Sequence, residues 1–326
     1  MTHHSLALCA LLFATACREP AEAREDRTSR APETEGTFAG VSDGAARYVK
    51  TIVGFGDPEC VRWDPAQDVY FVSNVAGFGS KKDNNGYISR IPAATLADAG
   101  VFVQGGKDGV ELHAPKGMAI QGDTLWVADI DVVRGFDKRT GRPVGTIDFR
   151  PLRPVMLNDL AVGPNGVLRV TDTGIWMVWE GNVHSGPDRI FEVGPGHAIT
   201  TIANSLWLRQ PNGVAWDSTA KRWVVVSFDR FAGEVATMPA GPDSSRHVIR
   251  TGPGQLDGVQ VRADGALLFA SWADSSIHLL KDGRDARIIR KVPEAAAIGW
   301  DGKRGRVLVP LATLGWVQVW ELRAKR

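Results

Sequence analysis

The heptapeptide PNGVAWD, at residues 211–217, recurs in altered form along the chain and decides its fold. Each copy has a small or polar residue ahead of alternating apolar positions, which is the pattern of a half-buried strand. The six copies are PECVRWD (58–64), PKGMAIQ (115–121), LNDLAVG (157–163), PNGVAWD (211–217), LDGVQVR (256–262) and AAAIGWD (295–301). Successive copies start 39 to 57 residues apart, which fits a four-stranded propeller blade with its loops.

Further strands follow every copy. After residue 217, for example, come RWVVVSF (222–228), GEVATM (233–238) and RHVIR (246–250). The sixth unit ends after its third strand, at Leu322, and the missing outer strand is available in YVKTIVG at residues 48–54. The sequence therefore predicts an all-β, six-bladed β-propeller over residues 45–326. We expect four-stranded antiparallel blades in a ring that closes by an N-terminal outer strand in the last blade.

One position of the repeat faces the propeller axis in every blade, because the first strand of a blade lines the central channel. The six residues at this position are Glu59, Lys116, Asn158, Asn212, Asp257 and Ala296. Four of them carry oxygen donors, the ligands of a hard divalent cation such as Ca²⁺, or of Mg²⁺ or Mn²⁺. None is His or Cys, which zinc or copper would favour. The alternative is that these side chains satisfy strand-end backbone groups and a column of water.

The ordered set of Glu, Asn-Asp, Asn-Gly and Asp-Gly in blades one, three, four and five resembles a known family. It is the senescence marker protein/gluconolactonase/luciferin-regenerating enzyme family of six-bladed propellers, and the resemblance covers residues 45–322. It implies that Glu59, four residues before Trp63, is a metal ligand. It likewise implies metal ligation by Asn212 and Asp257, and contact of Asn158 with the metal or the substrate.

The resemblance implies hydrolysis of a small-molecule lactone or related ester. A bound divalent cation would polarise the carbonyl, and Asp257 would activate water or relay protons. Asn158 and Lys116 complete the predicted catalytic set. Two alternatives stay open. One is a non-catalytic envelope propeller that binds a carbohydrate, peptide or protein partner and holds a structural Ca²⁺; the other is a lyase or condensing activity on the same scaffold.

Two residues depart from the sugar-lactone members of that family. Lys116 places a cation in the ring, where it either raises the field on an anionic substrate or pairs with Glu59 or Asp257. Met156 stands two residues before Asn158, where those members carry Arg to hold hydroxyl groups. An apolar side chain at that place argues against a polyhydroxylated substrate.

The N-terminal segment indicates export. Residues 5–16 form an apolar run that is too short to span a bilayer and suits a signal peptide. The following Cys17 completes a sequence that resembles a bacterial lipoprotein box, with simple signal cleavage as the alternative. We expect residues 1–17 to be this signal, residues 18–44 to be a flexible tether, and the protein to reach the periplasm or cell envelope with a lipid anchor on Cys17.

The composition of the chain argues against one class of binding partner. The formal net charge of +1 argues against nucleic-acid binding, which would require a basic surface. Beyond the export segment the chain has a single cysteine, Cys60, which alternates within an apolar strand. We expect a buried structural thiol there. The sequence leaves the oligomeric state open.

Overall fold

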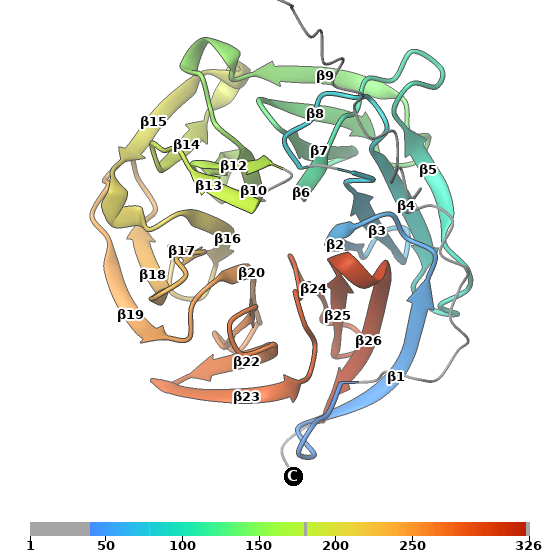
Figure 1. Ribbon diagram of the computed structural model, residues 1–326, viewed down its shortest axis with the longest axis vertical. Coiled ribbons are helices and arrows are strands. Elements are labelled where there is room, and N and C mark those ends of the chain that lie inside the picture. Colours follow the sequence, from blue (N-terminus) through green and yellow to red (C-terminus); the bar gives the residue numbers. More distant parts are fainter. Residues whose placement is uncertain (1–39, 78, 179–180, 324–326) are drawn as a thin grey trace, which may run out of the picture. The chain divides into compact units, whose positions relative to one another are not determined.

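The computed structural model describes residues 40–77, 79–178 and 181–323, all within the compact unit Thr34–Arg326. These residues form six four-stranded antiparallel sheets that follow one another around a central axis (Figure 1). The predicted all-β, six-bladed propeller is thereby confirmed.

Within each blade the strands run from the axis outward. The inner strands are β2 (Pro58–Asp64), β6 (Pro115–Gln121), β10 (Leu157–Val162), β16 (Pro211–Asp217), β20 (Leu256–Val261) and β24 (Gly299–Asp301). The second strands are β3 (Val69–Asn74), β7 (Thr124–Asp129), β11 (Leu168–Asp172), β17 (Arg222–Ser227), β21 (Leu267–Ser271) and β25 (Arg306–Leu311). The third strands are β4 (Tyr87–Pro92), β8 (Val132–Asp137), β14 (Arg189–Val193), β18 (Gly233–Pro239), β22 (Ser276–Lys281) and β26 (Trp316–Leu322).

The outer strands are β5 (Gly100–Gln104), β9 (Pro143–Asp148), β15 (Ile199–Asn204), β19 (His247–Gly252), β23 (Arg284–Arg290) and β1 (Ala46–Val53). A separate two-stranded hairpin, β12 (Ile175–Val178) with β13 (Gly181–His184), is inserted in the sequence between the second and third strands of the third blade, β11 and β14. The described helices are single 3₁₀ turns: η2 (Arg150–Leu152), η3 (Pro164–Gly166), η4 (Pro195–His197), η5 (Leu206–Leu208) and η6 (Ala312–Leu314). Within the described ranges no helix is long and apolar enough to cross a bilayer.

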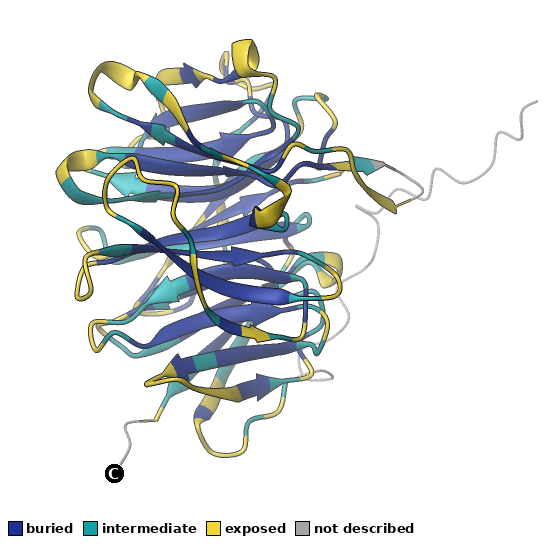
Figure 2. Ribbon diagram, turned by 90° about the vertical axis from the view of Figure 1, so that its left-hand side faces the viewer, coloured by how far each residue is buried: buried dark blue, intermediate teal, exposed yellow. Residues whose placement is uncertain are grey.

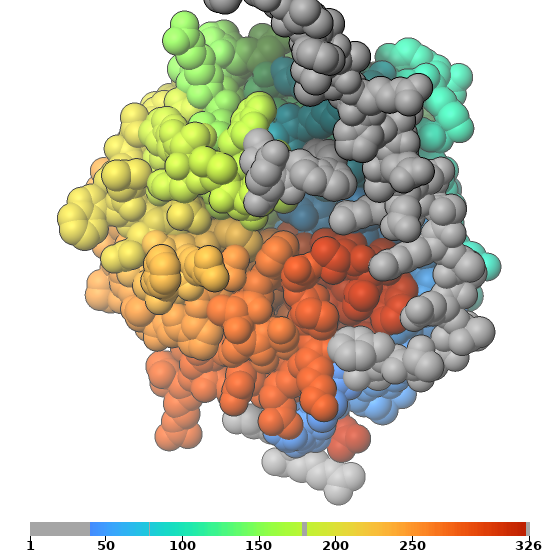
Figure 3. Space-filling view, viewed as in Figure 1, coloured from blue at the N-terminus to red at the C-terminus, as the bar shows by residue number. Residues whose placement is uncertain are grey.

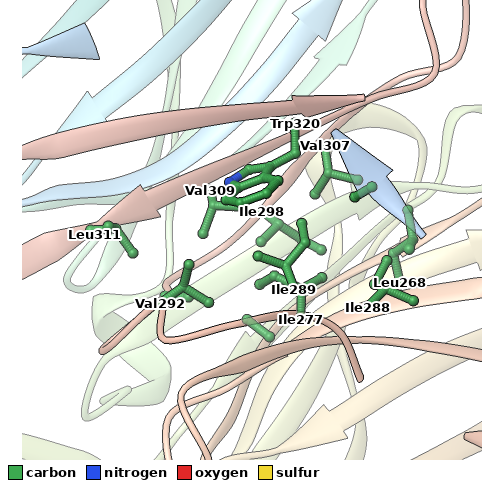
Figure 4. Packing of buried hydrophobic residues seen from close by; sticks show 13 residues of the cluster. Leu268, Ile277, Ile288, Ile289, Val292, Ile298, Val307, Val309, Leu311 and Trp320 are labelled. Atoms are coloured by element: carbon green, nitrogen blue, oxygen red, sulfur yellow. The ribbon is translucent and has the colours of Figure 1, made fainter. Parts of the chain in front are cut away.

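The core lies between neighbouring blades. Second strands such as β17 are buried on both faces, whereas the outer strand β9 is mostly exposed (Figure 2). Figure 4 shows one such layer, in which Ile277 of the fifth blade packs with Val309 and Trp320 of the sixth. Continuous burial of β-branched and aromatic side chains explains why these strands read as nearly unbroken apolar runs.

The ring closes as the sequence predicts. β1 pairs antiparallel with β26, with Ile52 opposite Val317, so one blade contains both ends of the described chain. The first and last inner strands also meet at the seam. Val61 donates its backbone N–H to the Ala297 carbonyl (3.1 Å), and Ala297 donates to the Glu59 carbonyl (2.8 Å). These bonds fix the backbone of a predicted site residue directly to the last blade.

Two details differ from the sequence prediction. The sixth copy was expected as a strand over 295–301, but β24 covers only Gly299–Asp301. Ala295 still bridges Leu311 of β25, and the ladder is interrupted at Ala297, which bridges Cys60 of the neighbouring blade. The described end of the predicted tether, residues 40–44, includes Val41, which bridges Arg290 at the end of β23. The signal peptide with Cys17, residues 1–17, and the rest of the tether lie outside the described residues.

Candidate functional site

The five polar ring residues occupy the same place in five blades. Each is the second residue of its inner strand, just after Pro58, Pro115, Leu157, Pro211 or Leu256. All are buried: the residue exposures are 9% for Glu59, 2% for Lys116, 4% for Asn158, 3% for Asn212 and 2% for Asp257. Ala296, the sixth, lies just before β24 and is fully buried.

At each of these five positions the pairing of the inner strand with the second strand shifts in register, so the ring residue has no cross-strand partner. In the fourth blade, Pro211 pairs with Ser227 and the next paired residue is Val214, so Asn212 and Gly213 have no cross-strand partner. The first, second, third and fifth blades have the same shift at the same place. Such bulges bend a strand and re-aim a side chain, which is a common feature of strand ends at binding sites.

The inner strands approach one another closely beside the ring. A Cβ at Gly213 would clash with the Asp257 backbone carbonyl, and a Cβ at Gly117 would clash with Asp159. In the second and fourth blades, packing at the axis therefore requires glycine after the ring residue.

Three charged groups share the ring. Lys116 Nζ lies 3.4 Å from Glu59 Oε1. Burial raises the pKa of Asp257 well above its usual range, the nearby Glu59 carboxylate adds to this rise, and the Lys116 ammonium opposes it. The structure thus brings Glu59, Lys116 and Asp257 together. Asn158 and Asn212 belong with them by their equivalent strand positions.

Two oxygen atoms of the ring have no hydrogen-bond partner among the described residues. They are Asn212 Oδ1 and Asp257 Oδ1, both fully buried. A buried acceptor without a donor is costly, and such atoms in native proteins mark a water, ion or ligand position. A carboxylate and an amide oxygen from adjacent blades are ligands that suit a hard cation. The ring residues therefore fit the cation that the sequence suggests, with Glu59 and Asn158 as the further oxygen donors.

Only two of the four oxygen donors in the ring, Glu59 and Asp257, are carboxylates. Within the described ranges no three His, Cys, Asp or Glu side chains group together as metal ligands. A cation in the ring would be held by two carboxylates and two amides, which is the chemistry of Ca²⁺ or Mg²⁺ sites and not of zinc sites.

A buried ion pair supports the ring from below, and sequence reasoning missed it. Arg62 donates to Asp159 Oδ1 (2.7 Å) and to the carbonyl oxygens of Met118 (2.7 Å) and Val61 (3.0 Å). Asp159 also accepts the backbone N–H of Val214. Burial raises the pKa of Asp159, while Arg62 opposes the rise. Arg62 and Asp159 thus tie four inner strands together across the channel.

The repeat itself contains the signal for this pair. When the six copies are aligned, Arg62 stands where three other copies have Ala, the fifth has Gln260 and the sixth has Gly. Asp159 stands where four copies have Gly or Ala and the first has Cys60. A long cation and an anion that occur once each in columns that are otherwise uncharged are candidates for a pair at the axis. Cys60 itself is fully buried, and burial raises the pKa of its thiol to about 12, as expected of a structural residue.

Two insertions cover the ring on its open side. Gly79, in the loop between β3 and β4, lies against Lys116, because a Cβ there would be 3.2 Å from Nζ. Ser80 Oγ accepts the backbone N–H of Met177 from β12 (3.0 Å). The yellow-green atoms of the β12–β13 hairpin reach toward the middle of this face (Figure 3). The two insertions therefore meet above the ammonium group.

An apolar wall adjoins the ring. Met156, Ile175 and Phe228 form a buried cluster, and Trp272 packs edge-on against Phe228 at 5.2 Å between ring centres. The Trp272 indole donates to the Ala295 carbonyl (3.0 Å) and also lies close enough to Asp257 to lower its pKa. Met156 thus belongs to an apolar cluster that adjoins the Asp257 carboxylate through Trp272.

Other polar groups near this face are engaged locally. His113 accepts the backbone N–H of Asn84 (3.0 Å) and contacts Glu111 (2.9 Å), and His184 contacts Asp188 (2.6 Å). A surface hollow of about 300 Å³ lies at the strand ends of the fourth blade, lined by residues that include Arg222 and Arg246. It does not include any ring residue.

Comparisons with known proteins give structural relatives only. No family model and no curated protein matches the sequence. Among solved structures, one described as a candidate gluconolactonase matches with a TM-score of 0.64 and 17% identity, covering 87% of this chain and 94% of that one. A luciferin-regenerating enzyme matches with a TM-score of 0.62 and 12% identity, covering 83% and 92%. A chain of a nidogen/laminin complex matches with a TM-score of 0.54 and 16% identity, covering 70% and 78%.

Two of these neighbours are of the kinds that the sequence resemblance names. Their identities are low, so they show the fold that this chain shares with them. The chemistry of this chain has to be argued from its own ring.

Proposed function

We propose that the protein hydrolyses a small lactone or related ester at the central ring, with a hard divalent cation held by Glu59, Asn158, Asn212 and Asp257. The observation that carries this proposal is the pair of unpartnered, buried oxygens of Asn212 and Asp257 beside the Lys116–Glu59 contact. A gluconolactonase and a luciferin-regenerating enzyme among the structural neighbours support a small-molecule substrate.

A cation bound there would polarise the carbonyl of the substrate and stabilise negative charge on its oxygen. Asp257 is the proposed general base, since its buried carboxylate takes the proton of the attacking water and returns it to the leaving oxygen. Lys116, which contacts the Glu59 carboxylate, donates hydrogen bonds to an oxygen that becomes anionic. The covering insertions exclude bulk water and so strengthen these interactions.

The apolar wall suggests the kind of substrate. Met156 and Phe228 offer contact area without hydrogen bonds, so they favour a lactone or ester with an apolar acyl group over a sugar acid lactone. We expect acyl lactones and aryl esters to be hydrolysed faster than aldonolactones.

The experiment is a hydrolysis assay of the purified chain on acyl lactones, aldonolactones and aryl esters, with and without chelator. Asp257→Asn is expected to lower kcat at least a hundredfold, because it removes the base and one negative charge from the cation site. Asp98→Asn is the matched control, since it makes the same change on an exposed loop. Turnover that survives both chelator and Asp257→Asn would refute this mechanism.

A binding function is the second candidate, and a specific surface favours it. Leu206, Trp207 and Phe231 are 69%, 77% and 90% exposed, in loops at the ring end of β16 and β17. Exposed aromatic side chains on neighbouring loops are typical of protein-binding surfaces. One structural neighbour comes from a nidogen/laminin complex. Stoichiometric cation binding without turnover of any substrate in the panel would favour this candidate.

A further inference from the structure

Lys116 is unusual among the ring residues because it is a buried lysine. Lysine is almost never fully buried unless it is paired, yet this residue is only 2% exposed. Within residues 40–77, 79–178 and 181–323, its ammonium group makes one hydrogen bond, to Glu59 Oε1 at 3.4 Å. That distance is long for a charge-assisted hydrogen bond. The ammonium group therefore pairs with Glu59, and one hydrogen bond uses only one of its three N–H donors.

The ammonium group is also enclosed. Gly79 lies against it from the first blade, and Met177 lies against Gly79 from the β12–β13 hairpin. The Ser80–Met177 hydrogen bond joins the two insertions over this place. Lys116 is therefore covered on this side by the two insertions.

We propose that Lys116 is a tethered cation that competes with a divalent metal ion for Glu59, so that the ring binds metal only by displacing its own ammonium group. This inference rests on the cation site of the proposed function and describes how that site is regulated by the chain itself.

Charge balance supports the competition. Glu59 and Asp257 together carry two negative charges, which a divalent ion would neutralise if it were alone. With the ammonium present, the same ion leaves an excess positive charge in a buried place, where like charges repel strongly.

The two sides of the ring differ accordingly. Glu59 is occupied by Lys116, whereas Asn212 Oδ1 and Asp257 Oδ1 have no partner in the described part of the chain. A metal ion in the ring would meet two oxygens without a partner in the described residues and one carboxylate that is already engaged. The ring should thus bind divalent cations weakly until the lysine is removed.

Calorimetric titration of the chelator-treated full chain with CaCl₂, and separately with MgCl₂, tests the inference without any substrate. Lys116→Met keeps the length of the side chain and removes its charge, and we expect it to bind Ca²⁺ at least tenfold more tightly than the unaltered chain. Lys116→Arg keeps the charge and should bind as weakly as the unaltered chain. Lys107→Met, at an exposed turn, is the matched control and should change nothing.

Glu59→Gln completes a double-mutant cycle. If the competition is for Glu59, Lys116→Met should improve Ca²⁺ binding much less in the Glu59→Gln background. Thermal unfolding with and without Ca²⁺ gives a second readout, since ligand that binds the folded state raises Tm. Lys116→Gln replaces Lys116→Met if the latter fails to fold.

Ca²⁺ affinities of Lys116→Met and the unaltered chain that agree within threefold would overturn the inference, and so would an absence of binding by both. Failure of the proposed function looks different. A chain that gains Ca²⁺ affinity on loss of Lys116 but hydrolyses no ester retains the inference and loses the enzyme.

Discussion

Arg62 and Asp159 form an ion pair of 2.7 Å between the first and third blades, in which the Asp159 side chain is fully buried and the Arg62 side chain is 13% exposed. Removal of one partner leaves an uncompensated buried charge. We therefore expect Asp159→Ala to lower the free energy of unfolding by about 3–5 kcal/mol, measured by urea denaturation.

The Arg62→Met, Asp159→Ala double variant should be less destabilised than the sum of its single variants, because it leaves no unpaired charge. The exposed pair of Arg139 and Asp123 provides the control, and Asp123→Ala should have little effect. Equal, small effects of both aspartate variants would contradict a structural role for Asp159.

Gly213 offers a test of how tightly the inner strands must approach. A Cβ at this residue would clash with the Asp257 backbone carbonyl and push apart the strands that hold Asn212 and Asp257. We expect Gly213→Ala to cost about 1–3 kcal/mol of stability and to weaken Ca²⁺ binding as well. Gly145→Ala is the matched control, since nothing lies within 4 Å of a Cβ there. Unaltered Ca²⁺ binding by Gly213→Ala would mean that ring geometry does not depend on this contact.

The six copies and the split last blade could be predicted because strand periodicity places one residue of each copy at the axis. The five polar ring residues follow from that register alone. The bulges that free them, and the contact of Lys116 with Glu59, arise between blades and depend on side-chain conformations that no local pattern determines. The short β24 also involves a contact between blades, since the ladder of the sixth sheet is interrupted at Ala297, which bridges Cys60 of the first blade.

Export of the protein and its lipid anchor on Cys17 stay predictions from sequence. We expect the mature chain to carry lipid on Cys17 and to partition into detergent, whereas Cys17→Ser should be found in the aqueous phase. Mass spectrometry of the N-terminal peptide checks the modification directly. A mature chain that begins after a simple cleavage and carries no lipid would support the alternative.

His278 should make stability depend on pH. Burial lowers the pKa of its imidazole, but hydrogen bonds with Asp274 and Asp285 outweigh this, so the pKa is raised above its usual value of 6.5. The folded state then holds the proton more tightly than the unfolded state. The resulting stabilisation is complete below about pH 6.5 and is lost as the pH rises through the folded-state pKa. Urea denaturation from pH 6 to 9 should show this loss, and His278→Gln should remove it. The exposed His247→Gln should leave it intact. An unchanged pH profile in His278→Gln would assign the loss to another group.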